Sequence, residues 1–429
     1  MRVQFVPIVT AALLQGGDLA DLVREVVFLA LIALLVILVT RRLTVPYTLG
    51  LVVVGLLIGV FNLAPEVRLT PDLVLFVFLP ALLFEGAWSL SVERLRENWK
   101  VIFLLAFPGL LLSLVLIAVP LHAFAGLTWL DAFLLAAILS PTDPIAVLGL
   151  FRQLSVNEQL ATVIEAESLF NDGVAGALYQ TFLALVLLSI NGQGLQLAQA
   201  WGQGLSTFLL EGGGSVVVGL VCGFIVTRGV RLIDDPMIET TITIVTAYGV
   251  YLIADFMHMS GILAVICAGL VLGSYGRKHG LSERTLEVTD NFWAMSAFLV
   301  NALLFLLVGA QINPVQFFAS PDAYGLLLKC ALVVCSVLVS RLVMVLLIPS
   351  SFPPFSGMRL RSWRFVIFWS GLRGALSLAL VLALPLNVPD RSALIYDTYA
   401  VVLFTLLGQG LSLRSILKKL PSVTRKLID

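Results

Sequence analysis

The apolar runs of this sequence constrain its fold more than any other feature. Between helix-breaking residues, they repeatedly reach the roughly 20 residues that a helix needs to cross a bilayer. Only 12% of the 429 residues are charged and 59% are hydrophobic, whereas soluble domains carry about 25% charged residues. This pattern predicts an all-α polytopic membrane protein; a soluble α-solenoid is the alternative.

The runs delimit about thirteen predicted spans. Their approximate ranges are 22–40, 45–62, 72–90, 100–123, 129–150, 159–190, 204–231, 237–256, 258–275, 288–312, 323–349, 362–386 and 394–414.

The distribution of Lys and Arg predicts the orientation of these spans. Nineteen bases fall on the side reached after odd-numbered spans, and four on the other side. Because cytoplasmic loops are enriched in Lys and Arg, we expect the N-terminus outside and the C-terminus in the cytoplasm, in the inner (plasma) membrane. The tail after residue 414 is too short for a separate cytoplasmic domain. Residues 1–20 fit an ordinary lead into the first span or, alternatively, a cleaved signal peptide.

An odd number of spans suggests two six-helix halves on either side of a seventh span. Halves arranged in this way have opposite orientations in the membrane. Inverted repeats are typical of secondary transporters.

Four charges lie deep inside four different spans. At about 1.5 Å per residue, Asp172 is near the middle of its span, and Glu85, Asp143 and Arg373 lie at a similar depth. A charge at mid-bilayer costs at least ~2.5–3.5 kcal/mol on insertion scales. Charges that only extend toward water would cluster near span ends, so the shared depth predicts a functional centre.

Glu167 and Arg341 form a second matched pair. Each lies about five residues to the cytoplasmic side of the middle of its span. They could form a gate, or a buried structural ion pair. We favour the structural pair, because a buried charge without its partner is left uncompensated.

Two spans contain helix-breaking segments at corresponding places in the two halves. "LSPTDPIAV" places Pro141 and Pro144 in the middle of the fifth span, and "GLRGALS" places two glycines around Arg373 in the twelfth. Proline removes a backbone donor and disfavours helix in the preceding residue. Interrupted helices at matching positions of inverted repeats indicate a transport site. Asp143 can offset the positive helix ends at such a break, and Arg373 the negative ends.

The polar residues of the sixth span suggest the chemistry of this site. Glu167 with Asn171, and Ser168 with Asp172, are spaced four residues apart and share a helix face. Their oxygens are hard ligands suited to a small cation, and Glu85 or carbonyls near Thr142 could complete the shell. A carboxylate there can hold a proton or a cation, but poorly both, which is the basis of exchange. No ATP-binding loop is present, and no cofactor is expected.

Several segments resemble the signature sequences of the monovalent cation/proton antiporters, in the branch of the bacterial NhaP and animal sodium/proton exchangers. They are "LPALLFE" (79–85), "SPTDPIAV" (140–147), "ESLFNDG" (167–173), "SGILAVICAGLVLG" (260–273), "NALLFLLVG" (301–309) and "GLRGALSLAL" (371–380).

The resemblance implies roles for particular residues. Asp172 would bind sodium and proton in turn, with Ser168, Glu85 and the main chain of Thr142 as further sodium ligands. Asn171 stands where electrogenic relatives carry a second Asp, which implies one-for-one electroneutral exchange. Glu167 with Arg341, and Asp143 with Arg373, would be structural ion pairs.

The resemblance also implies a homodimer that works by alternating access. A mobile core would comprise residues around 72–190 and 288–414, and a dimerisation scaffold those around 22–62 and 204–275. The partners would be sodium, protons and the lipid bilayer, with no nucleic acid. Potassium/proton exchange, a cation channel and a membrane-embedded hydrolase are the alternatives.

Overall fold

The computed structural model describes residues 18–43, 46–61, 63, 70–190, 197–311, 323–349, 359–420 and 423. Within these ranges every regular element is a helix. The candidate signal segment lies almost entirely outside them.

Helices occupy each of the predicted spans. In chain order they are α2 (Asp18–Leu43), α3 (Tyr47–Val60), η1 (Leu73–Phe78), α4 (Leu79–Ser89), α5 (Val92–Leu104), η2 (Leu105–Gly109), α6 (Leu110–Ala125), α7 (Trp129–Leu139), α8 (Ile145–Gln153), α9 (Glu158–Ile190), α10 (Leu197–Val230), α11 (Pro236–Phe256), α12 (Gly261–Val271), η3 (Leu272–Gly276), α13 (Arg277–His279), α14 (Glu283–Ala310), α16 (Ala323–Leu346), α17 (Leu360–Trp369), α18 (Ala375–Leu382), α19 (Arg391–Leu403), η4 (Phe404–Gly410) and α20 (Leu411–Lys418).

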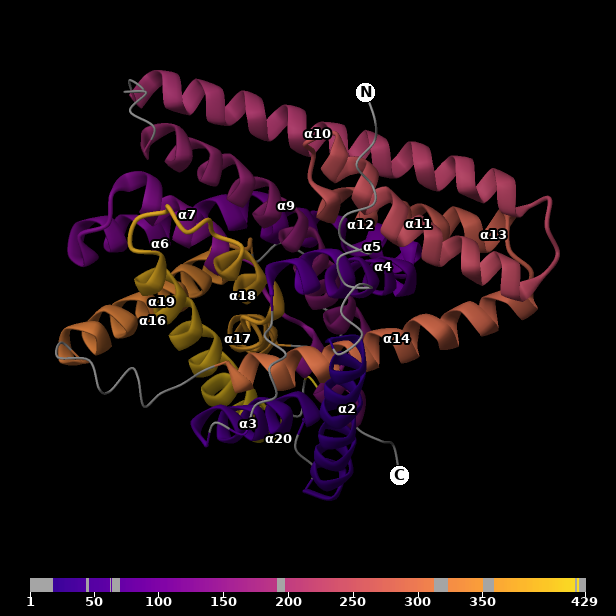
Figure 1. The fold of residues 1–429 in the computed structure, drawn as a ribbon, viewed down its shortest axis with the longest axis horizontal. Coiled ribbons are helices and arrows are strands. Elements are labelled where there is room, and N and C mark those ends of the chain that lie inside the picture. The colour runs from indigo at the N-terminus through magenta and orange to yellow at the C-terminus, as the bar shows by residue number, and fades with distance from the viewer. Residues whose placement is uncertain are drawn as a thin grey trace. The chain divides into compact units, whose positions relative to one another are not determined.

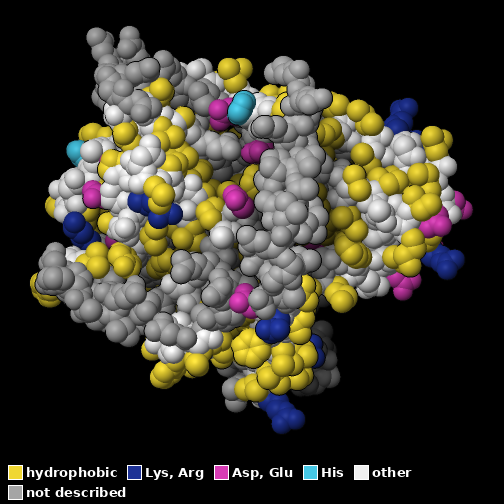
Figure 2. Space-filling view, in the orientation of Figure 1, with side chains coloured by type: hydrophobic (Ala, Val, Ile, Leu, Met, Phe, Trp, Pro, Cys, Tyr) yellow, Lys and Arg dark blue, Asp and Glu magenta, His cyan; other side chains and the backbone are white. Residues whose placement is uncertain are grey.

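The helices have the length and surface of membrane-spanning segments. Nine helices among the described residues are long and apolar enough to cross a membrane, and three shorter apolar helices accompany them. Large apolar side chains are exposed on outer faces of the helices, as with Val217 and Ile225 of α10 and Val245 of α11, each at least 60% exposed. Figure 2 shows such side chains spread over broad areas of the visible face. The prediction of an all-α polytopic membrane fold is confirmed, while the count of thirteen crossings and the inverted repeats stay predictions.

The chain forms two compact units. The first comprises residues up to 69 together with 301–319, and the second comprises residues 70–300 and 320–429. In the first unit, α3 approaches the end of α14 so closely that a Cβ on Gly55 would lie 2.9 Å from the nitrogen of Ala310. The boundaries of these two units differ from those of the expected core and dimerisation scaffold. That division stays a prediction.

The second unit is built around α9, the helix that carries the predicted site (Figure 1). Helix α9 packs against α5, α7, α10 and α12, and α4 packs against α12. Most of the side chains of α9 between Leu160 and Val186 are buried. Polar residues in the middle of α9 therefore face other helices.

Two predicted spans are interrupted in the middle, as the sequence indicated. The fifth is divided into α7 and α8 by residues 140–144, and the twelfth into α17 and α18 by residues 370–374. Residues Ser140, Thr142 and Arg373 of these segments are buried. The non-helical backbone is tolerated because protein surrounds it.

Candidate ion-binding site

The two interrupted helices meet at their breaks. The backbone nitrogen of Asp143 donates a hydrogen bond to the carbonyl oxygen of Leu372, at 2.8 Å. The nitrogen of Arg373 donates to Thr405 Oγ1 of η4, at 3.1 Å. These bonds satisfy backbone groups that an intact helix would have paired internally. The first holds the two non-helical segments together, and the second ties the later segment to η4.

Each charged residue of the breaks lies against the helix ends that it can stabilise. Arg373 Nη1 donates to the carbonyl oxygens of Ser140 and Pro141, the latter at 2.8 Å, just beyond the C-terminus of α7. Asp143 Oδ1 accepts from the nitrogen of Ile145 at 2.9 Å, at the N-terminus of α8. A guanidinium at carbonyls and a carboxylate at an N-terminus both oppose the partial charges of the helix dipoles.

The expected ion pair between Asp143 and Arg373 is not formed. The side chain of Arg373 binds carbonyl oxygens, and that of Asp143 binds an amide. Both charged side chains form hydrogen bonds with backbone groups that the breaks leave unpaired. The two residues share a structural role at the breaks, but each performs it separately.

Close backbone approach at Gly374 is a feature that the sequence analysis missed. A Cβ at this position would lie 2.6 Å from Asp143 Cβ and 2.7 Å from Asp143 Cγ. Only glycine leaves room for the Asp143 carboxyl group there. The glycines around Arg373 were recognised as helix breakers, but the side chain that fills the space could not be read from the sequence.

A buried polar cluster joins the break of α7–α8 to the middle of α9. Thr142 Oγ1 lies 2.8 Å from Ser168 Oγ, and Asn171 Nδ2 donates to Thr142 Oγ1 at 2.8 Å. Asn171 Oδ1 accepts from the nitrogen of Thr142 at 3.3 Å. All three residues are at most 4% exposed. Both ends of the Asn171 amide are thereby engaged with Thr142, so Asn171 ties the non-helical segment to α9.

Asp172 lies next to this cluster with an unused ligand position. Its Oδ1 atom is buried and has no hydrogen-bond partner. Its charge interacts with those of Asp143, Glu167 and Arg373. A buried carboxylate oxygen without a donor is costly, and a proton or a cation bound there would remove that cost. The oxygens of Thr142 and Ser168 are of the hard type that Na⁺ prefers.

Glu167 and Arg341 form a buried, two-pronged ion pair between α9 and α16. Arg341 Nη1 contacts Glu167 Oε1, and Arg341 Nη2 lies 2.8 Å from Glu167 Oε2. The side chains are 1% and 5% exposed. Arg341 Nη2 also donates to the carbonyl oxygen of Ile367 in α17, at 3.2 Å. The pair thus connects three helices around the site.

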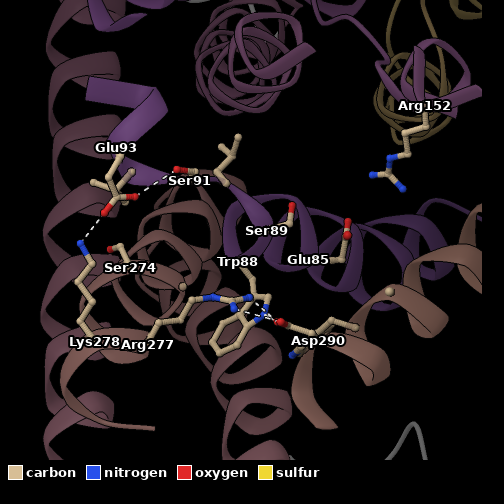
Figure 3. A pocket seen from close by; sticks show the side chains of 15 residues that line it. Glu85, Trp88, Ser89, Ser91, Glu93, Arg152, Ser274, Arg277, Lys278 and Asp290 are labelled. Carbon is tan, nitrogen blue, oxygen red and sulfur yellow. Dashed lines mark hydrogen bonds and ion pairs between the residues drawn. The ribbon is translucent and has the colours of Figure 1, made fainter. Parts of the chain in front are cut away.

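Glu85 lines a pocket of about 510 Å³ together with Trp88, Ser89 and Arg152. Its charge interacts with those of Glu165 and Arg152. Figure 3 shows the carboxylate of Glu85 pointing from α4 into this pocket. The sequence placed Glu85 at the depth of Asp172, and its role as a sodium ligand stays a prediction.

The comparisons with known proteins agree with this architecture. Residues 28–419 match the family model of the transmembrane sodium/hydrogen exchanger. The low-affinity Na⁺/H⁺ antiporter NhaS1 of Synechocystis sp. is 38% identical over 377 residues, which cover 88% of this chain and 70% of that protein. The Na⁺/H⁺ antiporter NhaH of Halobacillus aidingensis is 34% identical over 411 residues, covering 93% and 98%.

A solved structure shows the same fold. The sodium proton antiporter MjNhaP1 of Methanocaldococcus jannaschii superposes with a TM-score of 0.71 at 20% sequence identity, over 92% of this chain and 99% of that one. With the match of residues 28–419 and the interrupted helices on either side of Asp172, the chain belongs to the sodium/hydrogen exchanger family, whose members are transporters and not enzymes.

Proposed function

We propose that this protein exchanges sodium, or lithium, for protons across the inner membrane, with Asp172 binding cation and proton in turn. The observation that carries the proposal is the buried Asp172 Oδ1 atom without a hydrogen-bond partner. Ser168 lies one turn before Asp172 in α9, and its hydroxyl is 2.8 Å from that of Thr142. The names of the relatives, all Na⁺/H⁺ antiporters, support the substrates.

The proposed ligands of sodium are the carboxylate of Asp172, the hydroxyl of Ser168 and the main chain of Thr142. The hydrogen bonds from Asn171 hold Thr142 in place, which makes Asn171 a positioning residue in this scheme. Glu85 lies in the neighbouring pocket and would meet the cation on its way to Asp172. Glu167, Arg341, Asp143 and Arg373 would keep the helices in register around the site.

The cycle follows from competition for a single carboxylate. In one state of the protein a proton leaves Asp172 and sodium takes its place; after the site changes its access, the reverse occurs. A carboxylate that must be desolvated binds one of the two and not both. We expect alternating access in a homodimer, with the base-rich loops and the C-terminus in the cytoplasm.

Replacement of Asp172 tests the proposal. In inside-out membrane vesicles, Asp172→Asn should abolish sodium-driven proton movement, because an amide carries no charge and cannot exchange a proton. Glu97→Gln, which neutralises an exposed acid on α5, is the matched control and should transport at the wild-type rate. Exchange by Asp172→Asn at the wild-type rate would overturn the assignment.

Potassium/proton exchange is the nearest alternative. The oxygen ligands around Asp172 suit several alkali cations. We expect sodium and lithium to drive proton release and potassium to do so weakly. Parallel titrations of wild-type vesicles with the three chlorides distinguish the alternatives, since a larger response to potassium would assign the other substrate.

A further inference from the structure

Two charged residues, Glu165 and Arg152, have no role in the scheme above, and the charge of each interacts with that of Glu85. Two other charge sets of the pocket that Glu85 lines are neutralised directly. Lys278 pairs with Glu93. Asp290 pairs with Arg277, with Nη1–Oδ2 at 3.1 Å, and accepts from Trp88 Nε1 at 2.6 Å.

Arg152 differs from these bases. It lies near the end of α8, is exposed, and forms no ion pair among the residues that the structure describes. Its guanidinium points into the pocket toward Glu85 and Ser89 of α4 (Figure 3). Its charge interacts with those of both Glu85 and Glu165. One guanidinium without an ion pair among the described residues therefore interacts with the charges of two carboxylates.

Glu165 lies on α9, the helix of Asp172, and its charge interacts with that of Arg152 in the pocket. Helix α4, which carries Glu85, packs against α9, and a Cβ on Gly86 would lie 3.4 Å from Leu169 Cδ1. Glu165 precedes Asp172 by seven residues in α9, so the two carboxylates share a helix face about 10 Å apart. A cation that reaches Glu165 is thus about 10 Å from Asp172.

We propose that Arg152 competes with the arriving cation. Its guanidinium charge partly offsets those of Glu85 and Glu165 when the pocket is empty, and it moves aside when sodium passes. The proposal rests on the sodium/proton exchange proposed above. Arg152 and Glu165 would set the apparent affinity for sodium on the pocket side. They would not set the maximal rate, because neither group belongs to the Asp172 cluster.

The test measures the KM for sodium and the maximal rate of exchange separately for each variant. It uses inside-out vesicles, with sodium added on the side of the pocket. Arg152→Gln should lower the KM for sodium about three- to tenfold, since a unit charge near the path no longer repels the cation. Glu165→Gln should raise it by a similar factor. Maximal rates should stay near that of the wild type. Arg152→Lys, which keeps the charge, should restore the wild-type KM.

Arg96→Gln is the matched control. Arg96 is an exposed base of α5 that does not line the pocket, so the same charge change there should leave the KM unaltered. The KM difference between Arg152→Gln and the wild type should also shrink when choline chloride is raised from about 0.01 to 0.15 M, which shortens the Debye length from about 30 to 8 Å.

Active Arg152→Gln vesicles with an unchanged KM would overturn this proposal, and so would an equal KM shift in Arg96→Gln. The proposed function would still stand in both cases. Absence of sodium-driven proton movement in the wild type would overturn the proposed function itself.

Discussion

The buried charges of this protein are distinguished by what each one touches. Glu167 is held by Arg341 through two contacts, whereas Asp172 has an oxygen with no partner. Both are acids of α9, five residues apart. Removing the partner of a buried paired charge is costly, whereas a carboxylate oxygen without a donor leaves room for a ligand. We therefore expect Glu167 to have a structural role and Asp172 to exchange its ligand.

Loss of the Glu167 charge should destabilise the fold. In Glu167→Gln the Arg341 guanidinium stays buried without a counter-charge, which lowers the free energy of unfolding by about 3–5 kcal/mol. The measurement is thermal unfolding of the purified protein in detergent.

An exposed pair provides the control for this prediction. Glu158 and Arg94 form an ion pair whose side chains are 55% and 45% exposed, so Glu158→Gln should cost about 1 kcal/mol or less. Equal losses in the two variants would show that burial of the Glu167 pair does not contribute.

At the scale of the elements, the interrupted helices explain why the site lies in the middle of the second unit. Each break exposes backbone donors and acceptors that must be satisfied inside the protein. The Asp143–Leu372 backbone bond and the Asn171–Thr142 bonds satisfy some of them. The same bonds place the Thr142 hydroxyl beside Ser168, so the geometry of this polar cluster follows from how the breaks are stabilised.

A methyl group at Gly374 should disrupt this arrangement. In Gly374→Ala the new Cβ would lie 2.6 Å from Asp143 Cβ, which forces the carboxyl group away from the amide of Ile145. Overpacking of this kind costs about 1–3 kcal/mol, so we expect transport to fall tenfold or more. The variant should still assemble in the membrane.

Gly149→Ala is the companion variant. Gly149 lies in α8 with open space around the position of a Cβ, and alanine is the better helix former by about 0.5–1 kcal/mol. Transport and thermal stability should be retained or improved. Wild-type transport by Gly374→Ala would show that the close approach to Asp143 is unimportant.

For the whole molecule, the charge moved in each cycle depends on how many carboxylates exchange their ligand. Asp172 Oδ1 and Asp143 Oδ2 are both buried without a hydrogen-bond partner, but Asp143 is held at the break by the amide of Ile145. The neighbour Asn171 is neutral and engaged with Thr142, which leaves Asp172 as the proposed exchanging acid. One carboxylate can trade one sodium for one proton. We therefore expect electroneutral exchange.

The response to membrane potential checks this stoichiometry. In proteoliposomes with equal pH and sodium on both sides, a potential imposed with potassium and valinomycin should drive no net sodium uptake. Asn171→Asp, which adds a second carboxylate, is the variant in which a dependence on potential would be expected if it still transports. Potential-driven sodium uptake by the wild type would contradict one-for-one exchange.

The sequence by itself determined the fold class and located the two helix breaks. The apolar runs required membrane helices, because no other structure satisfies so much backbone in lipid. The prolines and glycines of two spans located the breaks. These inferences succeeded because they depend on local composition. The choice of Asp172 as the exchanging carboxylate, made from charges at one depth, stays a prediction.

Only the tertiary structure decided how the side chains are distributed. The side chains of Asp143 and Arg373 bind backbone groups and do not pair with each other. Glu85 lines a pocket with Arg152. Gly374 makes room for the Asp143 side chain. Depth along a span says how far a residue lies from the membrane surface but not which neighbour it faces. That direction is set by how helices distant in sequence are rotated and packed against one another, which no local pattern contains.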